Sequence, residues 1–228
     1  ILAGWYAFRM GLPVNKLICA SNENKILTDF FRSGRYDLER EFKQTISPSM
    51  DILISSNLER FLFEVTDHAA MKINRWMTAL NEEGCFEIDG ETRRPMEKII
   101  FAEFAGEGDT LKAIEEVFTR YAYLLDPHTA VGYRVYQKYR LQTDDSTKTV
   151  INATASPFKF SRSVLEAIKG PDYLQGKDEF DILQELGMIS NTTLHPAVKD
   201  LQKKNILHRA VCQKEGIREE IKKILEIS

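Results

Sequence analysis

Three short polar segments of this sequence carry side chains suited to binding a polar ligand. They are Ser21-Asn22, Asp126-Pro127-His128-Thr129 and Thr154-Ala155-Ser156. Each follows a short apolar or β-branched run, and open parallel sheets bind their ligands at the carboxyl ends of strands. Most of the side chains are hydroxyls and amides, which orient a ligand through neutral hydrogen bonds. The alternative is that these residues only cap the helices that follow them.

Motifs for a nucleophile or a metal site give a mostly negative result. The sequence contains no GxSxG, GxxxxGK[ST] or HExxH motif. The histidines show no ligand spacing: they are His68, His128, His195 and His208. Only His128 falls at a predicted strand end, where a structural role is the alternative. Lys159 lies between two phenylalanines, an environment that suits a Schiff-base lysine, or else it is a surface lysine whose stem packs on them.

The elements that would position these segments follow from the hydrophobic pattern. Short apolar or β-branched runs predict buried strands at 16–20 and 149–153. Apolar residues at helical spacing predict helices at 1–10, 24–32, 51–65, 67–80, 110–123, 130–139 and 164–169, with further helices from 178 onward. Residues 35–50 are polar and irregular, and we expect them to cross the surface.

Helix, strand and helix within the first 32 residues favour an α/β fold with a right-handed crossover. We expect residues 1–170 to form part of an α/β domain, with a peripheral insert or small strands near 81–108. Residues 171–228 are expected to form a helical extension that packs on the same domain. Ile1 to Ala7 reads as the middle of a helix, so we expect the chain to belong to a longer protein.

Composition and charge narrow the range of partners. The chain has 228 residues and a formal net charge of -3, which gives no electrostatic reason to expect nucleic acid or a membrane surface. No apolar run approaches the roughly 20 residues of a membrane span. The three cysteines are odd in number and far apart, which predicts neither a disulfide framework nor a zinc site and favours a reducing compartment such as the cytoplasm.

Several stretches, in this order and spacing, resemble threonine synthase of the fungal and enterobacterial type. That family belongs to the tryptophan-synthase-β-like, fold type II enzymes that use pyridoxal phosphate. The most diagnostic stretches are Ser47-Pro-Ser-Met-Asp-Ile52 and Ser55-Ser-Asn-Leu-Glu-Arg60. The others are Ile1-Leu-Ala-Gly-Trp-Tyr-Ala7, Gly11-Leu-Pro13, Ile18-Cys-Ala-Ser-Asn-Glu-Asn24, Leu27-Thr-Asp-Phe30, Asp126-Pro-His-Thr-Ala-Val-Gly132 and Ala153-Thr-Ala-Ser-Pro-Phe-Lys-Phe160.

The resemblance implies a lyase that converts O-phospho-L-homoserine and water into L-threonine and phosphate by γ-elimination and β-replacement. It implies an open α/β sheet with flanking helices and pyridoxal 5'-phosphate as cofactor, and the residue spacing described above predicts no metal site. By the same resemblance, the Schiff-base lysine and the phosphate-cradling loop lie in an N-terminal half that precedes Ile1. The chain by itself is therefore expected to be inactive.

The resemblance also implies roles for particular residues. Thr154 matches the threonine that faces the pyridine nitrogen, and Asp126, His128 and Thr129 match the segment that passes near the cofactor ring. Ser55, Ser56, Asn57 and Arg60 belong to a block expected beside the substrate channel. Arg60 is a candidate phosphate partner because its guanidinium binds phosphate bidentately, and a salt bridge is the alternative.

The sequence departs from the family pattern at two positions. Ser156 stands where relatives usually carry His, and Phe158 stands where a small residue is usual. Two other functions remain open. One is a non-catalytic module of this fold that binds a small phospho-ligand or serves as a scaffold. The other is a different fold type II lyase such as a dehydratase, although that branch lacks the two most diagnostic stretches.

Overall fold

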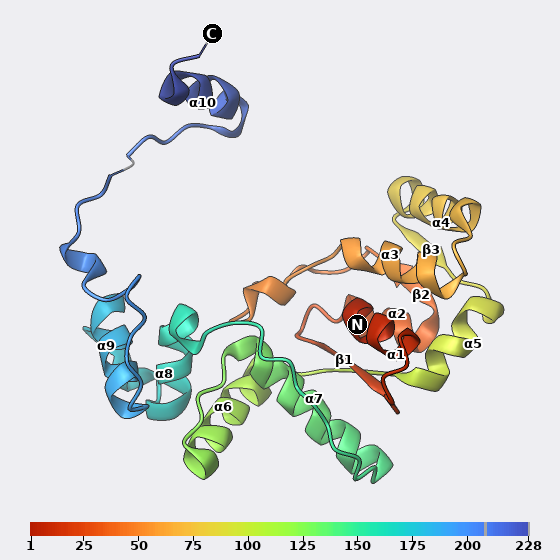
Figure 1. The fold of residues 1–228 in the computed structure, drawn as a ribbon, viewed down its shortest axis with the longest axis horizontal. Coiled ribbons are helices and arrows are strands. Elements are labelled where there is room, and N and C mark those ends of the chain that lie inside the picture. The colour runs from red at the N-terminus through yellow and green to blue at the C-terminus, as the bar shows by residue number, and fades with distance from the viewer. Residues whose placement is uncertain (208, 228) are drawn as a thin grey trace. The chain divides into compact units, whose positions relative to one another are not determined.

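The computed structural model describes residues 1–207 and 209–227 (Figure 1). The chain divides into two compact units, Ile1–Asn191 and Thr192–Ser228. The first unit contains every element that carries a candidate site residue.

Two parallel strands form the sheet at the centre of the first unit (Figure 1). Strand β1 (Leu17–Ser21) pairs with β4 (Ile100–Phe104), and Leu17 lies opposite Ile100 in the register. The pairing continues one residue beyond β4, because the N–H of Ala105 donates to the carbonyl of Ser21, the last residue of β1, over 2.9 Å. The carboxyl ends of β1 and β4 therefore lie side by side.

Helices cover both faces of this sheet, as expected for parallel strands. On one face, Ile18 and Ala20 pack with Val131 and Val135 of α7 (Pro127–Thr143). On the other face, Cys19 belongs to a larger core that includes residues of α2 (Ile26–Ser33). Burial there raises the pKa of the Cys19 thiol to about 11. Successive side chains of β1 therefore point to opposite faces of the sheet, into two separate apolar cores.

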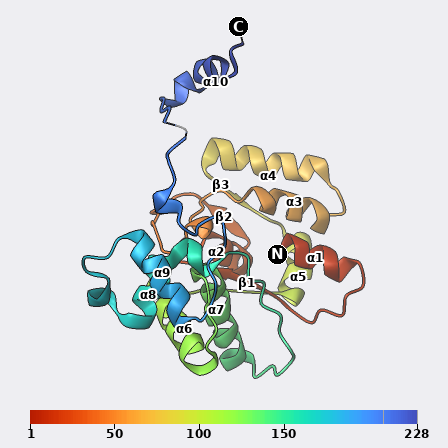
Figure 2. The ribbon, with the colours of Figure 1, turned by 60° about the vertical axis from the view of Figure 1, so that its left-hand side comes forward.

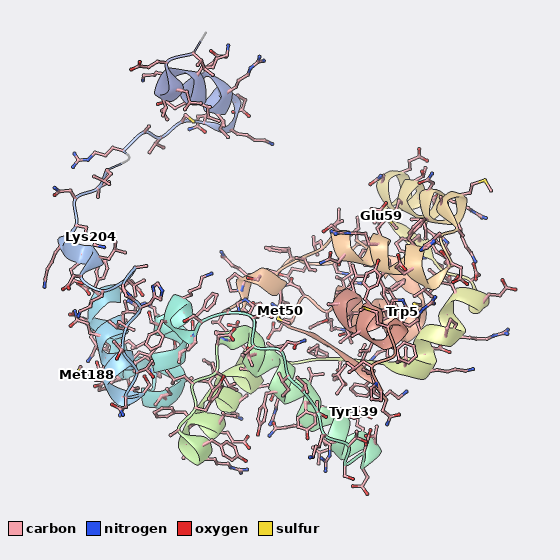
Figure 3. The ribbon with its side chains drawn as sticks, viewed as in Figure 1. Trp5, Met50, Glu59, Tyr139, Met188 and Lys204 are labelled. Atoms are coloured by element: carbon pink, nitrogen blue, oxygen red, sulfur yellow. The ribbon has the colours of Figure 1, made fainter. Side chains whose placement is uncertain are left out.

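The larger core is rich in aromatic side chains. Phe30 of α2 contacts Tyr36 of β2 (Arg35–Asp37) and Phe86 of β3 (Cys85–Glu87), and these two short strands pair antiparallel. Figure 3 labels Trp5 of α1 (Leu2–Arg9), whose ring meets that of Phe61 edge-on at 5.5 Å. The remaining helices of this region are α3 (Ser56–Val65), α4 (Ala70–Glu83) and α5 (Gly90–Ile99), and α3 runs beside α4 in Figures 1 and 2.

A second group of helices follows β4. Helix α6 (Glu107–Tyr121) packs on α7 and on α8 (Ser161–Lys169), and α8 packs on α9 (Glu179–Ile189). Two short 3₁₀ helices connect these elements, η2 (Pro157–Phe160) before α8 and η3 (Pro171–Leu174) before α9, and a third, η1 (Pro48–Met50), lies earlier, between β2 and α3. The core of this group is apolar and includes the fully buried side chains of Ala113, Ile114, Ala130, Val164 and Leu186.

The second unit contains η4 (Leu201–Lys203), η5 (Lys214–Gly216) and α10 (Ile217–Leu225). Helix α10 is amphipathic, and its apolar side chains are exposed at Ile217, Ile221, Ile224 and Leu225. Among the helices of the described residues, none is both long and apolar enough to cross a lipid bilayer.

Most of the predicted elements are confirmed, with shifted ends. The α/β class, the strand near 16–20 and the helices up to residue 169 are present in the first unit. The predicted strand at 149–153 is wrong, because nothing in the described chain pairs with it and most of its side chains are exposed. A β-branched run forms a strand only where a neighbouring strand supplies hydrogen bonds.

Residues 81–108 form regular secondary structure, and one of its strands is part of the central sheet. They form β3, α5 and β4, and β4 is the partner of β1. The predicted division into residues 1–170 and 171–228, with an insert near 81–108, stays a prediction.

Candidate functional site

A buried asparagine organises the carboxyl end of β1. Asn22 follows the strand directly, and its side-chain amide lies 2.9 Å from the Thr45 hydroxyl, 3.0 Å from the Ser47 hydroxyl and 2.7 Å from Asp51 Oδ1. Its Oδ1 accepts the N–H of Asn24 at 2.9 Å, which closes a tight turn after the strand. Asn22 therefore ties the loop 43–51 to the strand end.

Asp51 is the common acceptor of this network. Its Oδ2 accepts the N–H of Thr45 at 2.9 Å, and its Oδ1 accepts the Thr45 hydroxyl at 2.7 Å. The Asn24 amide reaches the same Oδ1 at 2.9 Å and the carbonyl of Lys43 at 2.7 Å. The two ends of the loop 43–51 are thus held by the same carboxylate.

The end of β4 joins the network through two glutamates. Glu107, in the first turn of α6, accepts the N–H of Ile46 at 2.7 Å, and its own N–H donates to Glu23 at 3.3 Å. Lys43 lies 3.1 Å from the Glu23 carboxylate. The hydrogen bond from Lys43 and the N–H of Glu107 lower the pKa of Glu23, so the carboxylate is ionised at neutral pH.

Asp126 caps α7 from a buried position. Its Oδ1 accepts the N–H groups of His128 at 2.9 Å and Thr129 at 3.4 Å, and its Oδ2 accepts the Thr129 hydroxyl. Pro127 occupies the first helical position, where its missing N–H costs nothing. The positive end of the helix also favours a carboxylate here. Local sequence therefore explains why Asp126, His128 and Thr129 come together.

The His128 ring joins this cap to two other segments. Nδ1 lies 2.9 Å from Asp126 Oδ1, and Nε2 accepts the N–H of Ser49 at 3.2 Å. The ring also meets that of Phe160 in η2 at a centroid distance of 4.8 Å. Met50, the neighbour of Ser49, is labelled in Figure 3 on the segment between β2 and α3, and it packs on the core beneath α7.

Thr154 lies between α7 and η2 in a segment that is neither helix nor strand, and its side chain is exposed. Its hydroxyl makes no hydrogen bond within the described part of the chain. Ser156 caps η2 by accepting the N–H of Phe158 at 3.3 Å. Lys159 is exposed, which favours the surface lysine over the desolvated one.

The block from Ser55 to Arg60 forms the start of α3. Ser55 and Asn57 line a hollow of about 680 Å³ between α1, β1, α2 and α3, whose walls are mostly apolar. The N–H of Ser55 donates to the Tyr36 hydroxyl at 3.0 Å. Its own hydroxyl and that of Ser56 make no capping bond at α3, taken over the described residues. Arg60 is exposed and forms no salt bridge in the same part of the chain.

His68 and His195 make local contacts within a few residues of their own positions. His68 stacks on Phe63 at 4.7 Å, and His195 accepts the N–H of Ala197. His208 lies outside the described residues. Across residues 1–207 and 209–227, no three His, Cys, Asp or Glu side chains gather in a way that could hold a metal ion.

Comparison with known proteins gives a consistent result. A family model described as "Threonine synthase, C-terminal" matches residues 129–211. The chain is 39% identical over 170 residues to threonine synthase-like 1 of Pongo abelii, a match that covers 74% of the chain. The crystal structure of threonine synthase from yeast covers 99% of the chain at 30% identity, with a TM-score of 0.79. The chain belongs to the threonine synthase family.

Another structure of this family is described as pyridoxal-phosphate-bound threonine synthase from Brucella melitensis. It is 37% identical and covers 80% of the chain with a TM-score of 0.68. The matches span 22% of the Pongo abelii protein, 38% of the Brucella chain and 45% of the yeast chain. The chain thus corresponds to less than half the length of these relatives. The predicted fold class, part of a fold type II α/β sheet with flanking helices, is confirmed.

Within this threonine synthase fold, the structure unites some predicted site residues and separates others. Asp126, His128 and Thr129 form one buried cluster, whereas Ser55 to Arg60 begin α3 and Thr154 is exposed before η2. Sequence reasoning missed the link between His128 and Ser49. Ser49 contributes only its main-chain N–H, which leaves no signal in the type of side chain.

Proposed function

We propose that this chain forms part of the cofactor domain of a threonine synthase. The reaction would convert O-phospho-L-homoserine and water to L-threonine and phosphate with pyridoxal 5'-phosphate. The observation that supports this most is the convergence of separate family stretches at His128, which contacts both the Ser47–Asp51 stretch and Phe160. The carboxyl ends of β1 and β4, where that convergence occurs, are the usual ligand side of a parallel sheet.

The residues present fit the cofactor. When bound, pyridoxal phosphate supplies an electron sink for carbanions formed on the substrate. Thr154 offers an exposed hydroxyl without a protein partner in the described chain, and we assign it to the pyridine nitrogen. A neutral hydroxyl there leaves that nitrogen largely unprotonated and moderates the electron sink. Asp126, His128 and Thr129 would lie beside the cofactor and shape the wall of its site.

The start of α3 fits the substrate. Ser55, Ser56 and Asn57 place hydroxyl and amide groups at a helix N-terminus, where main-chain N–H groups and the helix dipole favour anions. Arg60, one turn further, is exposed and without a salt bridge in the described residues, so its guanidinium is available to a phosphate. We propose that these four residues bind O-phosphohomoserine.

The remaining parts would come from residues that precede Ile1. The Schiff-base lysine and the loop that cradles the cofactor phosphate are expected there, so we propose that residues 1–228 alone do not turn over substrate. A cytoplasmic location is proposed as well, and the three free thiols suit a reducing compartment.

The test is a pair of substitutions at Thr154 in the full-length protein. Thr154→Asp places a carboxylate at the pyridine nitrogen, and we expect it to impair turnover while the cofactor still binds. Thr154→Ser keeps the hydroxyl and is the matched control, for which near-normal turnover is expected. Cofactor retention is followed by absorbance after dialysis, and turnover by phosphate release.

Two outcomes would count against the proposal. Unchanged turnover in Thr154→Asp would remove the role assigned to Thr154. A wild-type protein that retains the cofactor or a phospho-ligand but releases no phosphate would instead favour the non-catalytic binding module.

A further inference from the structure

The imidazole of His128 contacts three segments that are far apart in the sequence. Its Nδ1 lies 2.9 Å from Asp126 on its own helix, and its Nε2 lies 3.2 Å from the N of Ser49 in η1. Its ring packs edge-on against Phe160 in η2. The side chain is buried, so these contacts are shielded from solvent. Both flanking segments therefore meet α7 at one ring.

The two hydrogen bonds decide which nitrogen carries the proton. A main-chain N–H can only donate, so Nε2 must be the acceptor for Ser49. The Asp126 carboxylate accepts, so Nδ1 carries the hydrogen. Asp126 is itself fixed, because Thr129 and the first N–H groups of α7 donate to it. The carboxylate thus holds the imidazole in one neutral tautomer from behind.

We propose that His128 is a positioning residue, which holds the Ser47–Asp51 segment against the start of α7 through the N–H of Ser49. The turn of η1 uses the N–H groups of Met50 and Asp51 internally, and the N–H of Ser49 is the one that points to His128. Asn22 holds the same segment from the strand side through Ser47 and Asp51. The loop is therefore anchored on both sides of the strand end.

The positioning role of His128 follows from the hydrogen bonds of the Asp126, His128 and Thr129 side chains. Both carboxylate oxygens of Asp126, both nitrogens of His128 and the Thr129 hydroxyl are engaged with one another or with Ser49. The cluster acts on the site by fixing the loop rather than by touching a ligand with these atoms. Since the loop leads directly into Ser55 and α3, its effect on the reaction rests on the proposed function.

Two substitutions of His128, by glutamine and by asparagine, test its hydrogen bond to Ser49 independently of the one to Asp126. His128→Gln extends its Oε1 to the position of Nε2 and keeps an acceptor for Ser49. His128→Asn is one bond shorter, so it keeps a donor for Asp126 and loses the reach to Ser49. We expect exchange of the Ser49 amide hydrogen in the full-length protein without cofactor to be about tenfold faster in His128→Asn, as loss of one hydrogen bond predicts. In His128→Gln it should stay within about twofold of wild type.

The source of the tautomer is tested by Asp126→Asn. Asparagine is as good a helix cap as aspartate, so α7 keeps its start while the charge behind Nδ1 is lost. Asp178→Asn is the matched control, because Asp178 caps α9 in the same way without a histidine. Nitrogen-15 spectra of the His128 ring should show a single Nδ1–H tautomer in wild type and in Asp178→Asn. In Asp126→Asn the excess of that tautomer should be smaller, because a neutral amide oxygen is a weaker acceptor for the Nδ1 hydrogen than a carboxylate.

Several results would overturn the proposal. Equal exchange at Ser49 in wild type and in both His128 variants would show that the ring does not hold the loop, and equal acceleration in both would show only a loss of packing. An unchanged tautomer in Asp126→Asn would remove the role of the carboxylate. Turnover should follow the same order, with His128→Gln restoring what His128→Asn loses. A full-length protein without turnover that shows the expected exchange pattern would refute the proposed function and leave the positioning role standing.

Discussion

Replacement of Asp51 by alanine would remove the acceptor at the centre of the strand-end network. The carboxylate accepts the N–H and the hydroxyl of Thr45, and the side-chain amides of Asn22 and Asn24. Both asparagines are buried. Each of them keeps another acceptor when Asp51 is truncated, whereas the N–H of Thr45 loses its partner.

The free-energy loss in Asp51→Ala is estimated from the hydrogen bonds to Asp51 whose donors have no other acceptor. A hydrogen bond to a charged acceptor contributes about 1.5–3 kcal/mol, and those from Asn22 and Asn24 are partly compensated by the Ser47 hydroxyl and the Lys43 carbonyl. The Thr45 hydroxyl likewise keeps the Ser47 hydroxyl at 3.2 Å as a partner. We therefore attribute the loss to the bond from the Thr45 N–H and expect the free energy for opening the loop 43–51 to fall by about 1.5–3 kcal/mol.

Native-state amide exchange on the full-length protein measures this opening free energy directly. Peptides that cover residues 20–25 and 43–51 should lose protection together, because the same carboxylate joins them. Glu179→Ala is the control: it removes one salt bridge, to Arg162, from an exposed side chain and should change protection by less than about 1 kcal/mol. If Asp51→Ala resembles this control, the network does not hold the loop and the reasoning fails.

Two further predictions concern stability. Burial opposes ionisation of Asp89, but hydrogen bonds from Lys72 and Thr92 outweigh it and lower its pKa to about 2. Because this value lies below the 3.8 of the free side chain, the stabilisation is present above about pH 4 and is lost as the pH falls towards 2. Melting temperatures of Asp89→Asn should therefore depend less on pH in that interval than those of wild type. Phe30→Ala empties a fully buried position and should cost about 3–5 kcal/mol, whereas Phe42→Ala, at an exposed position, should leave the urea midpoint almost unchanged.

Local patterns predicted the elements whose signal is local. The strand β1 and helix α7 follow from an apolar run and from the Asp-Pro start of a helix, and both are present. The strand at 149–153 was predicted on composition alone and is wrong, because its formation needs a partner strand that the described chain does not provide. Strand β4 was anticipated only within a peripheral insert or small strands near 81–108, and its pairing with β1 was not predicted, since its five residues lie in a stretch where the helical pattern had loosened.

In the candidate site, too, local features could be predicted from the sequence and contacts between distant segments could not. Strand ends and the cap at Asp126 could be predicted because side-chain type and position in the element determine them. The contact between His128 and Ser49 could not, because it joins residues from distant parts of the chain through a main-chain group. The roles of Thr154 and of Ser55, Ser56, Asn57 and Arg60 stay predictions.

The buried thiol in the middle of β1 has a chemical consequence. Only a thiolate reacts readily with oxidants and alkylating agents, and Cys19 is both shielded by the sheet and protonated at neutral pH, since its pKa is about 11. Cys212 is exposed and has no such protection. Modification of the folded chain would therefore begin at Cys212, and a label on Cys19 would record that strands β1 and β4 had separated from their covering helices.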